Sequence, residues 1–110
     1  MANLNRVLLI GRLTDAPVLR HTTSDIPVAS FSVAVNRRTR SGEQPQVDYI
    51  DVVAWRQQAE FVARFFKKGS PIFVSGSLQL RTWKDNQGNN RRTFEVVADD
   101  LQFVESRKDG

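Results

Sequence analysis

Cysteine is absent from this sequence, and histidine, tyrosine and methionine each occur only once. Without cysteine the chain can form no disulfide, no thiolate zinc site and no cysteine nucleophile. The single histidine, His21, lies next to an expected turn, which argues against a Ser-His-Asp triad and against a histidine-rich metal site. We therefore expect no catalytic residues, no bound metal and no cofactor.

Long apolar runs are also lacking. The longest aliphatic run near the N-terminus covers residues 7–10, which is too short for the core of a signal peptide or for a membrane span. The chain has 110 residues, of which 40% are hydrophobic and 25% are charged, and this suits one compact domain with a modest core. We expect a soluble cytoplasmic protein with no membrane partner.

The positive charge is concentrated in two segments. Sixteen Lys and Arg against twelve Asp and Glu give the chain a net charge of +4. Each of the segments 36–42 and 81–92 has a net charge of +3, so the remainder of the chain sums to −2. This distribution favours a surface that binds a polyanion over general solubility. The alternative is two solvated hairpin tips that are basic without a binding role.

The most informative stretch is residues 47–55, VDYIDVVAW. β-branched and aromatic residues dominate it and no Gly or Pro interrupts it, so it predicts a β-strand. Because side chains alternate along a strand, one face is apolar and the other carries two aromatic rings around a carboxylate. The apolar face consists of Ile50, Val52 and Ala54, and the other of Tyr49, Asp51, Val53 and Trp55.

The second face of this strand predicts a binding surface. Burying the charge of Asp51 without a partner would cost several kcal/mol, so this face should meet water or a polar ligand. Exposed rings on a rigid strand form a platform on which flat groups can stack. The alternative is that Tyr49 and Trp55 pack under a loop or a second sheet.

The remaining pattern predicts further strands and one helix. Apolar residues at helical spacing indicate an amphipathic helix over residues 57–68, which Gly69 is expected to end. Alternation along 72–84 places Leu78, Leu80 and Thr82 on the core side, with Trp83 on the other side. The expected strands cover residues 4–13, 28–35, 72–84 and 91–98, with short continuations at 18–21 and 101–104.

This order of elements predicts an all-β fold. Gly11 and Gly76 lie inside expected strands and suggest the sharp bends that a small barrel needs. A five-stranded Greek-key barrel with one α-helix between strands three and four is the OB-fold, which binds oligonucleotides and oligosaccharides. We expect this domain over residues 1–105 and a frayed end over residues 106–110. An open α+β sheet is the alternative architecture.

Several motifs, in this order, resemble the bacterial single-stranded DNA-binding proteins over residues 4–103. They are LNRV (4–7), GRL (11–13), FSVAVNR (31–37), YIDVVAW (49–55), KKGS (67–70), GSL (76–78), RTW (81–83) and TFEV (93–96). The resemblance implies an OB-fold, a homotetramer and association with the nucleoid. It also implies non-enzymatic, largely sequence-independent binding of single-stranded DNA in replication, recombination and repair.

The resemblance also implies which residues contact DNA. Three aromatic residues fall where the family stacks bases, namely Tyr49, Trp55 and Trp83. Four basic residues fall among its backbone-contacting positions, and the basic loops supply three more: Arg6, Arg37, Arg81 and Lys84, then Arg38, Arg40 and Arg91. Stacking at roughly 1–3 kcal/mol per base is nearly independent of base identity, and Arg can pair with phosphate bidentately.

The sequence departs from the family pattern in three places. Residues 38–40 read Arg-Thr-Arg where relatives often place an aromatic residue, so charge replaces one stacking contact. His21 and the pair Ser24-Asp25 stand where relatives commonly have Tyr and an Asn-Gly type of turn, which puts the shape of that hairpin in doubt. The sequence ends at Gly110 without the linker and acidic tip through which family members recruit replication and repair proteins. We expect an isolated binding domain or a short paralogue.

Two other functions remain open from the residues alone. A metal-dependent hydrolase would use converging carboxylates, but the candidates alternate with core residues or lie at a strand end: Asp48, Asp51, Asp99 and Asp100. An OB-fold module that binds RNA or a protein partner, as in a primosome, is the second alternative. The 2′-hydroxyl would distinguish RNA from DNA.

Overall fold

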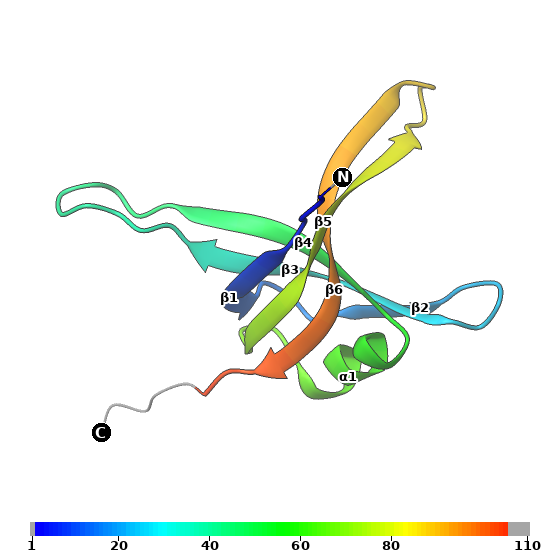
Figure 1. Cartoon of the computed structure of the whole chain (residues 1–110), viewed down its shortest axis with the longest axis horizontal. Helices are drawn as coiled ribbons and strands as arrows, with labels where there is room; N and C mark the ends of the chain where they lie inside the picture. Colours follow the sequence, from blue (N-terminus) through cyan, green and yellow to red (C-terminus); the bar gives the residue numbers. More distant parts are fainter. Residues whose placement is uncertain (1, 106–110) are drawn as a thin grey trace.

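The structure is a computed structural model that describes residues 2–105. These residues form six strands and one helix, which are arranged as in Figure 1. In chain order they are β1 (Val7–Leu13), β2 (Val18–His21), β3 (Pro27–Asn36), β4 (Val47–Trp55), α1 (Gln57–Phe65), β5 (Pro71–Lys84) and β6 (Asn90–Phe103). The frayed end that we expect over residues 106–110 lies outside the described residues.

Five of the strands close into a barrel. They neighbour one another in the order β1-β5-β6-β4-β3, and β1 returns to β3 through the pairs Arg12↔Ala34 and Leu13↔Val33. The pairing of β4 with β6 is parallel and the other pairings are antiparallel. The short β2 pairs with the far end of β3. Because β4 and β5 are the third and fourth barrel strands, the predicted OB-fold with its helix between them is confirmed.

The core fills the barrel and the space under α1. Its buried residues come from the inward positions of the barrel strands and from one side of the helix, where Ala59 and Val62 are fully buried. The largest fully buried side chains are Leu13, Val33, Val52, Val62, Ile72, Val74 and Val96. Burial of this apolar surface, at about 25 cal/mol per Å², is the main term that stabilises the barrel.

The two predicted bends lie at crowded points of the barrel. At Gly11 a Cβ atom would collide with the carbonyl oxygen of Ala34, and at Gly76 it would collide with the carbonyl oxygen of Val97. The register between β5 and β6 also shifts at Ser75 and Gly76, which is the signature of a bulge. Only glycine fits where the strands approach so closely.

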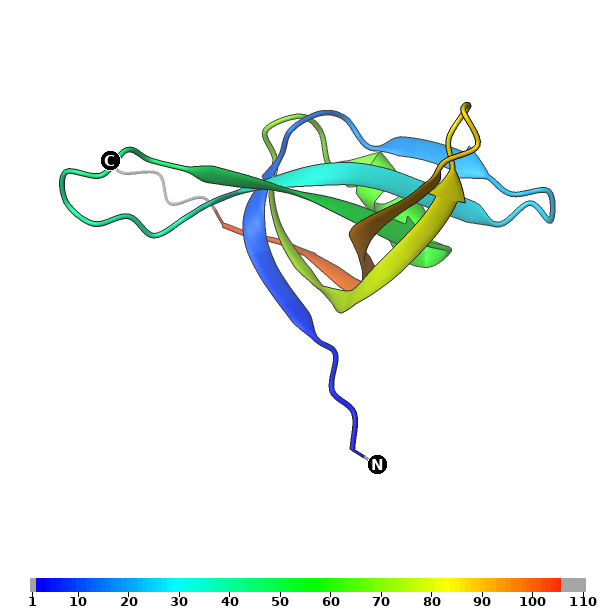
Figure 2. The ribbon, with the colours of Figure 1, turned by 90° about the horizontal axis from the view of Figure 1, so that it is seen from above.

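One prediction about β5 is wrong. Leu78 and Leu80 are 43% and 48% exposed, and Thr82 is also exposed, so the core side of this strand ends at Gly76. Beyond the bulge, β5 pairs only with β6 and leaves the barrel as a two-stranded hairpin. We call this hairpin, residues 77–97, the β5–β6 arm (Figures 1 and 2).

The predicted helix is also too long. It ends at Phe65, because Phe66 is extended, with φ −118° and ψ 147°, and its ring turns into the core. Lys67 and Lys68 therefore follow the helix instead of forming its last turn. Gly69 does have a positive φ of 87°, but it serves the next turn, where its N–H donates to the carbonyl oxygen of Leu13.

Three hairpins project from the barrel in different directions (Figures 1 and 2). Besides the β5–β6 arm, β2 and β3 form one, and β3 and β4 continue past the barrel into the loop of residues 37–46. We call the outer end of this last hairpin, residues 35–48, the β3–β4 arm. Within residues 2–105, no helix is long and apolar enough to cross a membrane.

Candidate nucleic-acid interface

The outer face of β4 carries the two aromatic residues that its alternation predicts. Tyr49 is 69% exposed and Trp55 is 43% exposed, whereas Val52 and Ala54 are buried. The prediction that β4 has one core face and one open face is confirmed.

A small residue on β3 leaves the ring of Tyr49 uncovered. In the register of β3 with β4, Ala34 lies opposite Tyr49, and its side chain is too short to cover the ring. Trp55 lies opposite Val28, near the end of the ladder, and is also partly exposed. The rings are held by a strand inside the barrel wall, so their positions are fixed while their outer faces stay accessible.

Trp83 lies on the β5–β6 arm and is 43% exposed. It pairs with Arg91 across the arm. A shallow hollow surrounds the ring and is lined by Thr82, Trp83, Lys84, Asn90, Arg91 and Arg92. Here an aromatic face and several cations lie within one surface, which suits a base together with its phosphate.

A second hollow joins the β4 face to the base of the β5–β6 arm. Its lining includes Asp51 and Val53 from β4, Ser32 from β3, and Arg81 and Glu95 from the arm. Six of the ten candidate DNA contacts lie on the two elements that this hollow connects, two on β4 and four on the β5–β6 arm, and three more lie on the β3–β4 arm. Among residues 2–105, Asp51 has no ion-pair partner.

Arg37 is engaged inside the β3–β4 arm. Its Nε donates to both carboxylate oxygens of Asp48 at 3.0 and 2.9 Å, and its Nη2 donates to Oδ1 at 2.8 Å. Its Nη1 donates to Oε1 of Gln46 at 2.9 Å. These hydrogen bonds and the opposite charge raise the pKa of Arg37 and lower the pKa of Asp48. The pair clamps the two strands of the arm where the loop begins.

The tip of the β5–β6 arm is held in a similar way. Asp85 accepts hydrogen bonds from the backbone N–H groups of Asn89 and Gln87, each at 2.9 Å, and from Nε of Arg91 at 3.0 Å. These bonds, that of Asn89 first, lower the pKa of Asp85. Arg91 thus helps to fix the turn.

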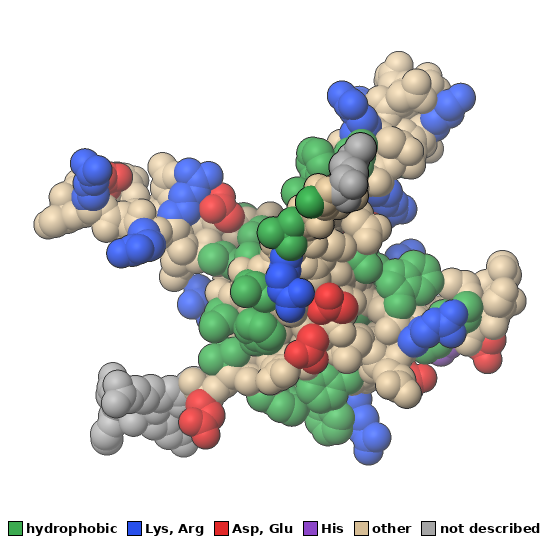
Figure 3. Space-filling model, in the orientation of Figure 1, with side chains coloured by type: hydrophobic (Ala, Val, Ile, Leu, Met, Phe, Trp, Pro, Cys, Tyr) green, Lys and Arg blue, Asp and Glu red, His purple; other side chains and the backbone are tan. Residues whose placement is uncertain are grey.

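Other basic residues of the two arms stay unpaired. Within the described part of the chain, ion pairs join only Arg37 to Asp48 and Arg91 to Asp85. Arg38, Arg40, Arg81, Lys84 and Arg92 therefore keep their charges available, and Figure 3 shows Lys and Arg side chains along both arms. Arg92 is not among the predicted contacts, but it lines the same hollow as Trp83 and is a further candidate.

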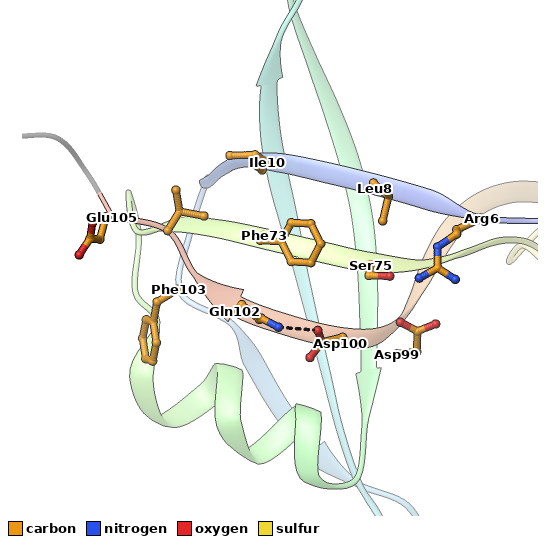
Figure 4. Close-up of a pocket in the computed structure, with 11 residues that line it drawn as sticks. Arg6, Leu8, Ile10, Phe73, Ser75, Asp99, Asp100, Gln102, Phe103 and Glu105 are labelled. Atoms are coloured by element: carbon orange, nitrogen blue, oxygen red, sulfur yellow. Dashed lines mark hydrogen bonds between the residues drawn. The ribbon is translucent and has the colours of Figure 1, made fainter.

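Arg6 is not brought together with the other candidates. It lines a wide hollow over β1, β5 and β6, where Figure 4 shows it near Asp99 and Asp100. The same hollow has exposed apolar walls, because Leu8 is 59% and Ile10 is 60% exposed. This face differs in chemistry from the aromatic and cationic surface of β4 and the arms.

The carboxylates named for a metal-dependent hydrolase do not converge. Asp48 is paired with Arg37, Asp51 lies on the β4 face, and Asp99 and Asp100 line the hollow beside Arg6. Among residues 2–105, no three His, Asp or Glu side chains come close enough to hold a metal ion.

Comparison with known proteins identifies the family. The family model of the single-strand binding protein family matches residues 4–104. The chain belongs to this family. A single-stranded DNA-binding protein of Caldanaerobacter subterraneus subsp. tengcongensis is 50% identical over 106 residues, which are 94% of this chain and 70% of that protein.

Other members of the family are similarly close. Single-stranded DNA-binding protein 3 of Listeria innocua is 44% identical over 97% of this chain and 68% of its own length. Single-stranded DNA-binding protein A of Bacillus subtilis is 48% identical over 97% of this chain and 63% of its own length. The chain thus spans about two thirds of the length of these relatives.

The ion pair between Arg37 and Asp48 predicts how the β3–β4 arm responds to pH. Since the folded-state pKa of Asp48 lies below its ordinary value of 3.8, the pair stabilises the arm fully above that value. This stabilisation is lost as the pH falls through the lowered pKa. In an NMR titration of the side-chain carboxyl, Arg37→Gln should return the pKa of Asp48 to its ordinary value.

Arg38→Gln is the matched control for this titration. It removes the same charge from the neighbouring position, where no ion pair with Asp48 forms, and should leave the pKa of Asp48 lowered. Equal effects of the two substitutions would mean that the charge of the loop as a whole lowers this pKa.

Proposed function

We propose that this protein binds single-stranded DNA, largely without regard to sequence and without catalysis. The observation that carries this proposal is the pair of exposed rings, Tyr49 and Trp55, on a strand that the barrel holds rigidly, in a member of the single-strand binding protein family. Bases stack on Tyr49, Trp55 and Trp83. Cations on the two arms contact the phosphates.

Stacking explains why such binding does not depend on sequence. Every base has a flat π-face, and stacking on an aromatic side chain is worth about 1–3 kcal/mol per base. In a duplex these faces are occupied by neighbouring bases, so the exposed rings select single strands. Because the three rings lie on two β-strands, they can stack on bases at separate points along one single-stranded DNA.

The cations divide into two groups in this proposal. Arg38, Arg40, Arg81, Lys84 and Arg92, which are unpaired within the described residues, contact phosphates directly. Arg37 and Arg91 add positive charge while they fix the arms through Asp48 and Asp85. Arg6 remains a candidate phosphate contact for single-stranded DNA that is long enough to reach the face formed by β1, β5 and β6.

We further propose that the protein acts as a homo-oligomer, with a tetramer as the expected state. Support comes from the apolar walls of the hollow over β1, β5 and β6, to which Leu8, Ile10 and Phe103 contribute exposed surface. Large apolar side chains gathered on one sheet face are typical of protein interfaces. The roles expected of such an assembly are in DNA replication, recombination and repair, at the nucleoid of the cytoplasm.

The two tryptophans test the stacking proposal. Trp55→Ala and Trp83→Ala should each weaken binding of oligo-dT by roughly 1–3 kcal/mol, the value of one stacked base. Fluorescence titration measures this, since a stacked base quenches the indole. Because both side chains are 43% exposed, neither substitution should cost the ~3–5 kcal/mol of unfolding free energy expected for truncation of a buried aromatic residue.

Phe31→Ala is the comparison for stability. Phe31 is 7% exposed, and its truncation should show the full core penalty in urea unfolding. The stacking proposal fails if Trp55→Ala destabilises the fold as strongly as Phe31→Ala while the folded fraction binds oligo-dT normally.

The unpaired arginines test the electrostatic part. For single strands, the logarithm of the binding constant falls with the logarithm of salt concentration by about 0.7 per neutralised phosphate. Replacing Arg38 and Arg40 together by Ala should therefore flatten the slope by roughly 1.4, if each contacts one phosphate. Titrations with oligo-dT at several salt concentrations measure the slope.

A double substitution beyond α1 is the control for the slope. Lys67→Ala with Lys68→Ala removes the same charge from exposed positions outside both arms, and should change the slope much less. Equal slopes for the two double variants would place the phosphate contacts elsewhere, most directly on the β5–β6 arm.

The oligomer proposal is tested by sedimentation at micromolar concentration. The wild-type protein should sediment as an oligomer, and Ile10→Glu should shift it to smaller species, because a charge would then enter the apolar hollow. Leu4→Glu is the control, since Leu4 is 91% exposed and does not line the hollow. A monomeric wild-type protein would contradict the proposal.

A further inference from the structure

The β5–β6 arm depends on its root for its direction. Up to Gly76, β5 is flanked by β1 on one side and β6 on the other, but beyond it only β6 remains. All the side chains from Leu78 to Lys84 are exposed. An isolated two-stranded hairpin is at best marginally stable, so its own core cannot fix its angle to the barrel.

One side chain is hydrogen-bonded to the arm at this root. The side-chain amide of Asn5 donates from Nδ2 to the carbonyl oxygen of Leu78 at 2.7 Å. It also accepts, at Oδ1, from the backbone N–H of Leu78 at 2.9 Å. The two residues are 73 positions apart in sequence, so this contact joins separate parts of the fold.

The amide of Asn5 takes the place of a missing strand. The last pair between β1 and β5 is Val7↔Gly76, and two further steps in the same antiparallel register would bring Asn5 beside Leu78. The backbone of β1 does not continue that far, but the side chain offers the same donor and acceptor. The hydrogen bonding between β1 and β5 is thereby extended by two residues onto the arm.

The position of Trp83 is sensitive to the hydrogen bonds between Asn5 and Leu78. Trp83 lies five residues along β5 from Leu78, which is roughly 17 Å at the usual rise of a strand. A rotation of ~10° at the root would therefore displace the ring by roughly 3 Å, using the same length. Such a displacement is comparable to the distance between stacked rings, so the angle at the root determines whether Trp83 can meet a base.

We infer that Asn5 is a positioning residue for single-strand binding. By pairing with the backbone of Leu78, it sets the direction of the β5–β6 arm and so holds Trp83 and Arg81 in place relative to the rings of β4. This inference rests on the proposed function, since it assigns Asn5 a part in the same site. Asn5 itself acts through Trp83 and need not touch DNA.

The test uses Trp83 as the only tryptophan reporter. The chain has two tryptophans, and Trp55→Phe leaves Trp83 alone while it keeps a ring at position 55. In this background, Asn5→Ala should lower the fluorescence anisotropy of Trp83 in the free protein, because the arm moves more. It should also weaken oligo-dT binding by about three- to tenfold, as expected for the loss of exposed hydrogen bonds between a side chain and the backbone.

Two further variants separate positioning from general effects. Asn3→Ala removes the same kind of side chain two positions earlier, where Asn3 is exposed and makes no side-chain hydrogen bond within the described residues, and it should change neither readout. Asn5→Asp keeps the size and the acceptor but replaces the donor by a charge facing the carbonyl oxygen of Leu78. It should behave like Asn5→Ala. Thermal unfolding of each variant shows that it is folded at the assay temperature.

The outcomes are distinct. The inference is overturned if Asn5→Ala matches Asn3→Ala in both anisotropy and affinity. It is also overturned if affinity falls only in proportion to the unfolded fraction, since Asn5 would then be merely structural. If the wild-type protein binds no oligo-dT, the proposed function fails instead, and the anisotropy of the free Trp55→Phe protein still reports whether Asn5 fixes the arm.

Discussion

The antiparallel ladder between β3 and β4 is the interaction on which both the barrel and the candidate site depend. Its nine pairs run from Val28↔Trp55 to Asn36↔Val47. Because side chains alternate, this one register places Val52 in the core and Tyr49 on the surface. A slip by one residue would exchange the two faces, bury the rings and expose the core residues. The fold and the candidate site therefore depend on the same register.

The sequence predicted most reliably those features that alternation alone determines. The bounds of β4 and the identity of its two faces follow from nine uninterrupted residues, and the structure confirms both. The bends at Gly11 and Gly76 were also predictable, because glycine inside a strand marks close approach of another backbone. The predicted order of strands, with one helix between the third and the fourth, is compatible with few barrel topologies.

The errors arose where an apolar pattern continues past the end of the helix or past the part of a strand that faces the core. Phe66 fits the apolar stripe of α1, but the chain becomes extended there and the ring stacks on Phe103, with centroids 4.9 Å apart. Leu78 and Leu80 keep the alternation of β5 after the bulge has taken the strand out of the barrel. In both cases tertiary packing, not the local pattern, decides where the helix ends or where the core face of the strand ends.

The candidate site could be predicted in its composition but not in its internal contacts. Sequence identifies the rings and the two basic segments, yet it does not show that Arg37 pairs with Asp48. That pair depends on the β3–β4 register, which places Val35 opposite Asp48 and brings the Arg37 guanidinium within reach. The amide of Asn5 is a similar case, since its partner Leu78 is 73 residues away.

The two arms differ in what they must hold, and their anchors differ accordingly. Coulomb attraction between a guanidinium and a phosphate extends over roughly 8–10 Å at moderate salt, so in the proposed function the β3–β4 arm need not place Arg38 and Arg40 closely to attract single-stranded DNA. Stacking requires contact at one angle, and the β5–β6 arm carries a ring. A single ion pair at its base suffices for the first arm, whereas the second is hydrogen-bonded to the barrel through Asn5 and closed at its tip by Asp85. The precision of each anchor matches the range of the interaction that it supports.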